Sequence, residues 1–282
     1  MISPPFVLAR RFVAGPDAES AIAAGRKLHA RGIAATFDLL GEDVRDADAA
    51  RRSAEANKDL LRRIPAEVER NVSLKLTMLG LDVSDEVCRE NVAGVLEVAR
   101  EVGGFVRIDM EGSRHTQRTL DLFRALRARF DNVGIVLQAY LHRTPDDVRE
   151  AIAKGDRVRL CKGAYKEPPA VALQSMEDIR RAYRRCAHEL LDEGCYPAIA
   201  THDEALIQDT LAHAAEGTLA PSRFEFQMLY GLRPRRWQEL VAAGHRMRIY
   251  VPYGTHWFPY FYRRLRERKE NVFFVLRSLL GG

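Results

Sequence analysis

Several short segments of this chain alternate aliphatic side chains with polar ones, and each leads into a stretch of helical pattern. In the segment 107–111, Arg107, Asp109 and Glu111 share one face of a strand, because successive side chains point to opposite sides. Ile108 and Met110 fall on the other face. A parallel strand covered by helices on both faces would be apolar throughout. A closed barrel explains the pattern, since helices bury its outer face while its inner face lines a polar site.

Eight segments qualify as strands. They span residues 34–39, 72–76, 106–110, 133–138, 157–162, 198–200, 224–228 and 247–251. Helical patterns fill the seven gaps and follow the last strand, at residues 44–64, 84–102, 115–129, 145–154, 176–193, 203–216, 234–243 and 259–268. Eight strand-helix units in about 250 residues predict an α/β fold, a (β/α)8 barrel of the TIM type, rather than a doubly wound sheet.

Local signals add detail to this barrel. A helical pattern at residues 16–31 predicts an extra N-terminal helix. Thr144, Pro145 and Asp147 predict a helix start, with the threonine as its capping residue. No change of composition and no linker divides the chain, so we expect a single barrel domain over residues 1–282.

Composition narrows the partners and the compartment. The net charge of +5 and the isoelectric point near 9.1 are typical of nucleic-acid binding, but the arginines are interleaved with acids, so we expect no nucleic-acid partner. The cysteines form no C-x-x-C pair, which favours reduced thiols, a cytoplasmic protein and no metal site. No apolar run approaches the ~18 residues of a membrane span. Contact with a membrane surface stays open, because residues 272–280 are markedly apolar.

Function in a barrel of this type comes from the carboxyl-terminal mouth. Polar candidates on the inward face or just past the strand ends are Lys75, Asp109, Glu111, Gln138, Arg159, Lys162, His202, Glu225, Gln227 and Tyr250. They form either a site or a buried ion-pair network that only fixes the barrel. Because a buried lysine needs a partner, Lys75 and Lys162 are either neutralised by Asp109 or Glu111 or await an anion.

The last helical segment, residues 259–268, contains a candidate anion-binding site. Tyr260, Arg263, Arg264 and Glu267 are spaced i, i+3, i+4 and i+7, which puts them on one helical face. Two arginines there can bind a carboxylate or a phosphate, although a solvated charged stripe would look similar. The aromatic run 257–260 leads into the arginines, and this favours a lid over a small anionic substrate.

Ordered motifs from about Thr36 to the C-terminus resemble one family. They are Arg107-Ile-Asp-Met-Glu111, Leu160-Cys-Lys-Gly-Ala-Tyr165, Ala200-Thr-His-Asp203, Phe224-Glu-Phe-Gln-Met-Leu-Tyr-Gly231, Arg248-Ile-Tyr-Val-Pro-Tyr-Gly254 and Tyr260-x-x-Arg-Arg-Leu265. The chain resembles proline dehydrogenase in its short monofunctional bacterial form, and the proline dehydrogenase domain of proline utilisation A. The resemblance implies an FAD-dependent barrel that oxidises L-proline to Δ1-pyrroline-5-carboxylate. It also implies electron transfer to a membrane quinone, with peripheral contact at the inner membrane face.

The resemblance assigns roles to matching positions. Lys75, Arg263 and Arg264 hold the substrate carboxylate, Tyr250, Tyr260 and Leu229 surround the proline ring, and Asp109 completes the catalytic pocket. Arg159 lies by the flavin N5, where negative charge develops. The other FAD contacts are Met110, Val136, Gln138, Lys162, Gly163, Ala164, Thr201, His202 and, at the adenosine end, Glu267. A pairing of Glu42 with Arg266 would close the site.

Two alternatives remain open at this point. A barrel lyase or aldolase would use Lys75 or Lys162 as a Schiff-base nucleophile with a lowered pKa. A basic RNA-binding barrel would show salt-dependent affinity and no flavin colour. The visible spectrum before and after L-proline separates the dehydrogenase from both. Oligomeric state, the physiological electron acceptor and acceptance of hydroxyproline stay open.

Overall fold

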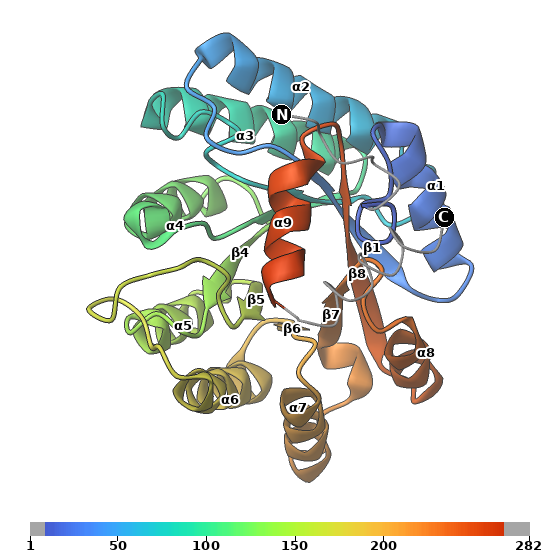
Figure 1. Cartoon of the computed structure of the whole chain (residues 1–282), viewed down its shortest axis with the longest axis vertical. Coiled ribbons are helices and arrows are strands. Elements are labelled where there is room, and N and C mark those ends of the chain that lie inside the picture. The colour runs from blue at the N-terminus through green and yellow to red at the C-terminus, as the bar shows by residue number, and fades with distance from the viewer. Residues whose placement is uncertain (1–8, 268–282) are drawn as a thin grey trace.

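Eight parallel strands close into a barrel in chain order, and β8 pairs back to β1 (Figure 1). The computed structural model describes residues 9–267, with side chains as far as residue 262. The strands are β1 (Ala34–Leu39), β2 (Asn71–Leu74), β3 (Phe105–Ile108), β4 (Val133–Gln138), β5 (Val158–Cys161), β6 (Ala198–Ala200), β7 (Glu225–Leu229) and β8 (Arg246–Tyr253). The predicted (β/α)8 barrel is confirmed, and each strand lies within two residues of its predicted bounds.

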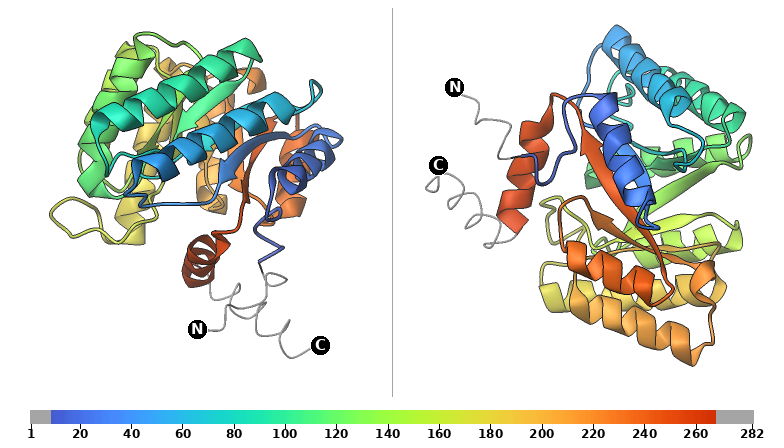
Figure 2. Two further views of the ribbon diagram at one scale, coloured as in Figure 1. Left: turned by 90° about the horizontal axis from the view of Figure 1, so that it is seen from above. Right: turned by 90° about the vertical axis from the view of Figure 1, so that its right-hand side faces the viewer.

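Helices surround the barrel and one more precedes it (Figure 2). They are α1 (Ala18–His29), α2 (Ala47–Arg63), α3 (Asp85–Glu101), α4 (Ser113–Arg127), α5 (Thr144–Ala153), α6 (Met176–Glu193), α7 (Glu204–Glu216), α8 (Pro234–Ala242) and α9 (Trp257–Glu267), with a short 3-10 turn at Pro221–Arg223. The extra N-terminal helix is therefore confirmed as α1. Helix α9 packs through Trp257, Tyr260 and Phe261 on Phe12, Leu40 and Leu232.

The alternation seen in the sequence separates the two faces of the barrel wall. Val72, Val106, Ile108, Phe226 and Ile249 have no exposed surface, and they belong to one continuous apolar core between the strands and the surrounding helices. Burial of such side chains contributes about 25 cal/mol for each Å² of apolar surface removed from water. The polar residues between them face the barrel interior.

Most helices begin with a side-chain cap, but the predicted cap of α5 is wrong. Asp17, Ser84 and Ser175 each accept a hydrogen bond from a backbone N–H in the first turn of their helix, which satisfies a donor that has no helical partner. Thr144 lies one residue inside α5 and donates its hydroxyl to the carbonyl of Gln138 at 2.6 Å. It therefore ties α5 to the end of β4.

The amino-terminal end of the barrel interior holds a closed ion-pair network. Glu225, at the start of β7, accepts from Arg248 Nε at 2.8 Å, and Arg248 also donates to Glu69 and to the carbonyl of Ala35. Burial would raise the pKa of Glu225, but the Arg248 guanidinium outweighs it and lowers that pKa to about 2. The placement of Glu225 at the mouth is wrong, because it lies at the opposite end of its strand from the cavity.

Candidate active site

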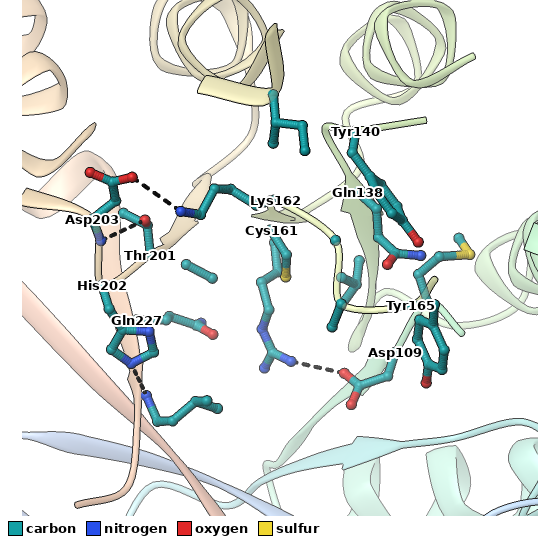
Figure 3. A pocket seen from close by; sticks show the side chains of 18 of the residues that line it. Asp109, Gln138, Tyr140, Cys161, Lys162, Tyr165, Thr201, His202, Asp203 and Gln227 are labelled. Carbon is teal, nitrogen blue, oxygen red and sulfur yellow. Dashed lines mark hydrogen bonds and ion pairs between the residues drawn. The ribbon is translucent and has the colours of Figure 1, made fainter. Parts of the chain in front are cut away.

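A cavity of about 560 Å³ opens at the carboxyl ends of the strands (Figure 3). This volume lies within the range of small-molecule and cofactor sites. The predicted substrate, catalytic and flavin residues whose side chains the structure describes all line this cavity: Lys75, Asp109, Met110, Val136, Gln138, Arg159, Lys162, Gly163, Ala164, Thr201, His202, Leu229, Tyr250 and Tyr260. The predicted residues Glu42, Glu111 and Glu225 do not line it. The strand ends therefore bring together residues that span most of the chain.

Lys75 lies just past the end of β2, and its charge is balanced by two carboxylates. Its Nζ donates to both oxygens of Asp38 at 2.8 and 2.9 Å, and Asp109 Oδ2 is 3.9 Å away. The predicted partner Glu111 is wrong, because its carboxylate instead accepts from the backbone and hydroxyl of Thr77. Lys75 is thus held in a charged state at the cavity wall.

The pKa values in this cluster follow from burial and from the neighbouring charges. Burial raises the pKa of Asp38 to about 6, and it prevails over the attraction of Lys75. Burial alone would lower the pKa of Lys75, but Asp38 and Asp109 raise it above its usual value. Burial and the nearby carboxylates also raise the pKa of Tyr250, which therefore stays protonated and donates to Asp109 at 2.8 Å.

Arg159 comes from β5 and lines the cavity beside Asp109. Its Nη1 donates to Asp109 Oδ1 at 2.8 Å, and its Nη2 donates to the hydroxyl of Ser73 at 3.1 Å. Its guanidinium carbon lies 5.4 Å from the centre of the Tyr250 ring. With Lys75 and Asp38, the four charged groups balance to zero, so this wall suits a ligand with one positive and one negative group.

The opposite side of the cavity is formed at the ends of β5 and β6. Lys162 Nζ lies 3.1 Å from Asp203 Oδ2, so neither Asp109 nor Glu111 neutralises this lysine (Figure 3). Asp203 also caps α7, where its side chain accepts from the backbone N–H of Ala205. The backbone N–H of Leu229 donates to His202 Nε2 at 2.9 Å. A neutral imidazole that accepts at Nε2 carries its proton on Nδ1, which makes His202 a donor there.

Amide side chains and one glycine complete the lining. Gln138 donates to the carbonyl of Glu111 at 2.9 Å, and Gln227 lines the cavity from β7. Gly163 has a φ of +117° and packs so closely on Tyr140 that a Cβ would lie 2.2 Å from the ring. A larger residue at position 163 would therefore displace Tyr140, which itself lines the cavity.

Part of the predicted site lies beyond the described side chains. Arg263, Arg264, Arg266 and Glu267 fall within the backbone of α9, but their side chains are outside the described residues. The apolar segment 272–280 is also outside them. The carboxylate grip, the adenosine contact and the pairing of Glu42 with Arg266 therefore stay predictions.

Sequence reasoning missed several residues of the site, including Asp38, Tyr140 and Glu167. Asp38 is 1% exposed and binds Lys75, and the alternation of Thr36 and Asp38 with the apolar residues of β1 could have revealed it. Tyr140 lines the cavity from beyond the end of β4. Glu167 lines it from the connection between β5 and α6, and no periodic pattern in the sequence marks this position.

A scan against protein-family models matches residues 21–277 to the family described as proline dehydrogenase. The chain belongs to the proline dehydrogenase family. Proline dehydrogenase 1 of Bacillus subtilis subsp. natto is 42% identical over 273 residues, covering 96% of this chain and 90% of that protein. Proline dehydrogenase of Deinococcus radiodurans is 38% identical, covering 98% and 91%. The chain is therefore a proline dehydrogenase oxidoreductase.

Solved structures give the same fold. Proline utilization A from Bdellovibrio bacteriovorus, inactivated by N-propargylglycine, matches with a TM-score of 0.85 and 26% identity over 92% of this chain. This proline dehydrogenase spans about a third of that larger protein, at 32% of its length. Within residues 9–267, no helix combines the length and the apolar character needed to cross a membrane.

Proposed function

We propose that the enzyme oxidises L-proline to Δ1-pyrroline-5-carboxylate with FAD as the hydride acceptor, and that its electrons pass to a membrane quinone. The observation that carries this proposal is the charge-balanced wall that Lys75, Asp109 and Arg159 form at the cavity together with Asp38, which binds Lys75. L-Proline at neutral pH carries one carboxylate and one ammonium group. A wall with two cations and two anions matches such a zwitterion without a net excess of charge.

The residues around the cavity fit a flavin. Gln227 Oε1 and Arg159 Nε are buried and have no hydrogen-bond partner among the described residues. Buried polar groups of this kind normally find a partner, and the isoalloxazine ring carries both donors and acceptors. The lysine and hydroxyl donors of Lys162 and Thr201 suit the phosphate and ribityl parts. FAD, when bound, would accept the hydride from the substrate carbon.

Lys75 and Asp109 would orient the substrate. The raised pKa of Lys75 keeps its ammonium charged, and a charged donor binds a carboxylate with about twice the strength of a neutral one. Asp109 is held by Tyr250 and Arg159, so its carboxylate is fixed where it could meet the substrate ammonium. Arg263 and Arg264, on the predicted helical face, would add the second grip on the carboxylate.

Arg159 would favour the transfer of negative charge toward the cofactor. Arg159 is 4% exposed, and its guanidinium is already fixed by Asp109 and Ser73. A preorganised charge in a site with little water stabilises charge that develops in the transition state. It therefore acts on the rate of oxidation more than on substrate binding.

The lyase alternative loses support at Lys75. A Schiff-base lysine needs a lowered pKa so that its amine is neutral and nucleophilic. Asp38 and Asp109 instead raise the pKa of Lys75, and Lys162 is paired with Asp203.

A membrane acceptor would place the enzyme in the cytoplasm with peripheral contact at the inner membrane face, which we add to the proposal.

The visible spectrum of the purified protein tests this function. We expect the absorbance of oxidised flavin, its bleaching by anaerobic L-proline, and its return when a soluble quinone analogue is added. A colourless protein that forms a borohydride-trapped substrate adduct would overturn the proposal in favour of the lyase. A flavin that proline leaves oxidised would overturn the substrate assignment.

A further inference from the structure

Helix α4 begins without a capping side chain of its own, and a residue from another segment takes that place. Its N-cap is Gly112, which has no side-chain acceptor. The backbone N–H of Ser113 donates to Glu167 Oε1 at 2.7 Å, and the hydroxyl of Ser113 donates to Oε2 at 2.5 Å. A carboxylate at this position satisfies a free N–H and interacts favourably with the positive end of the helix.

The contact joins two segments that line the same cavity. Glu167 belongs to the connection between β5 and α6, whose residues Lys162, Gly163 and Ala164 line the cavity. Ser113 follows the link that carries Asp109 and Met110, which also line it.

The same link is tied to the neighbouring strand end. The carbonyl of Glu111 accepts from Gln138 at 2.9 Å, and Gln138 is another lining residue. One carboxylate thus connects the β5–α6 connection to a chain of contacts that leads through the β3–α4 link to β4.

Glu167 lies midway between two other anchors of this connection. At its beginning, Ala139 and Tyr140 donate backbone hydrogen bonds to the carbonyls of Cys161 and Lys162 at 2.8 and 2.9 Å. Near its end, Leu173 donates to the carbonyl of Tyr140 at 2.8 Å. The segment 163–166 crosses the cavity edge between the first anchor and Glu167.

We propose that Glu167 is a positioning residue for the cofactor: by capping α4, its carboxylate holds the segment 163–166 at the cavity edge in the conformation that FAD meets. This inference rests on the proposed function. A segment that is already ordered loses less conformational entropy when a ligand binds. If the contact is removed, only a fraction of molecules presents the binding conformation, and the apparent dissociation constant rises by the inverse of that fraction.

The test compares Glu167→Ala with a matched variant, Asp17→Ala. Asp17 caps α1 in the same way, accepting from the backbone and hydroxyl of Ser20 at 2.9 and 2.6 Å, and it does not line the cavity. Dilution of each purified protein, followed by the fluorescence of released flavin, gives the FAD dissociation constant. We expect roughly a tenfold increase for Glu167→Ala, the scale of one charge-assisted hydrogen bond, and less than a twofold change for Asp17→Ala.

Two further measurements separate positioning from general destabilisation. Hydrogen exchange of the amides 163–166 should be faster in Glu167→Ala than in the wild type, and unchanged in Asp17→Ala. Glu167→Gln keeps one acceptor oxygen and should recover part of the FAD affinity. Ser113→Ala keeps the backbone N–H and should weaken FAD binding less than Glu167→Ala does. It also serves as the test if Glu167→Ala does not fold.

The results of these experiments distinguish the role of Glu167 from the proposed FAD-dependent function on which it rests. A wild-type protein that binds no FAD would overturn the proposed function, whereas the exchange measurement would still report on the contact. A wild type that binds FAD together with a Glu167→Ala variant of the same affinity would overturn the positioning role alone. Unchanged exchange at residues 163–166 would likewise show that Glu167 does not order the segment.

Discussion

The two ends of the barrel interior use the same residue types for different purposes. At the amino-terminal end, Arg248 binds Glu225, Glu69 and a backbone carbonyl. At the carboxyl-terminal end, Lys75 binds Asp38 and Arg159 binds Asp109, and all of these except Asp38 line a cavity of about 560 Å³. Charge balance alone therefore does not distinguish a structural network from a site. What distinguishes them is whether the charged groups face an open cavity.

The largest effect is expected at the closed end. Glu225→Ala leaves the buried Arg248 without its main partner, and breaking a buried pair in this way destabilises a protein by about 3–5 kcal/mol. Urea unfolding measures the loss. Glu55→Ala removes a surface pair with Lys58 and should change the free energy of unfolding by less than about 1 kcal/mol. Equal effects in the two variants would contradict the structural role of the closed end.

At the open end, the expected effect is on ligand binding. Lys75→Met should raise the dissociation constant of a non-oxidisable proline analogue by roughly ten- to a hundredfold, the scale of a charge-assisted hydrogen bond to a carboxylate. The retained flavin spectrum is the control for folding. Arg263→Met and Arg264→Met should behave in the same way. If all three variants bind the analogue as the wild type does, the carboxylate assignment is wrong.

The two ends should also respond to pH in opposite directions. Glu225 has a pKa lowered from 4.5 to about 2, so its contribution to stability is lost as pH falls through this range. Asp38 has a pKa raised from 3.8 to about 6. The folded state therefore holds its proton more tightly, and stability falls as pH rises from about 4 to 6. Each contribution is on the order of 1–3 kcal/mol.

This contrast is checked by measuring the free energy of unfolding of the wild type, Glu225→Gln and Asp38→Asn between pH 2 and 7. Glu225→Gln should remove the part of the stability loss at low pH that comes from protonation of Glu225. Asp38→Asn should remove the fall in the free energy of unfolding between pH 4 and 6. The same pH dependence in Asp38→Asn and the wild type would show that Asp38 ionises normally, which would contradict the raised pKa that burial gives it.

The smallest effect is expected at the lid. Tyr260 on α9 lines the cavity, so a bound analogue should slow hydrogen exchange of the amides in α9. A ligand shifts this equilibrium only through contacts that it makes in the closed state. Glu42→Ala should reduce the protection if Glu42 pairs with Arg266. Equal exchange with and without saturating analogue would make α9 a fixed wall.

The sequence predicts the barrel well because one physical rule, the alternation of side chains between the two faces of a strand, identifies the strands that form its wall. The pairing inside the barrel is less predictable. Lys75 binds Asp38, which lies 37 residues earlier, because the register of β1 and β2 brings their ends together. Alternation places Glu225 and Gln227 on the same inward face of β7. It does not show that Glu225 lies at the amino-terminal end of the barrel, away from the cavity. That the chain forms a single domain stays a prediction.

Local signals failed where a tertiary contact was stronger. Thr144 has the sequence signature of a cap, yet its hydroxyl donates to Gln138. Gly112 has no capping side chain, and Glu167, 54 residues after Ser113, supplies one by accepting from the Ser113 N–H. Glu167 is distant in the sequence, so no local pattern could reveal it. Gln138 lies only six residues before Thr144, but their contact forms because α5 packs against the end of β4.

The most direct test of the account compares two buried arginines of the barrel interior. Arg159 lines the cavity, whereas Arg107 donates to the backbone carbonyls of Ile135 and Arg157 toward the amino-terminal end. Stopped-flow measurement of flavin reduction by anaerobic L-proline should show a rate about 10²–10³-fold lower in Arg159→Met, the scale of one lost electrostatic stabiliser. Arg107→Met, once folded, should be reduced within about threefold of the wild-type rate. Equal slowing in both variants, or slowing in Arg107→Met alone, would contradict the division between a structural end and a catalytic end.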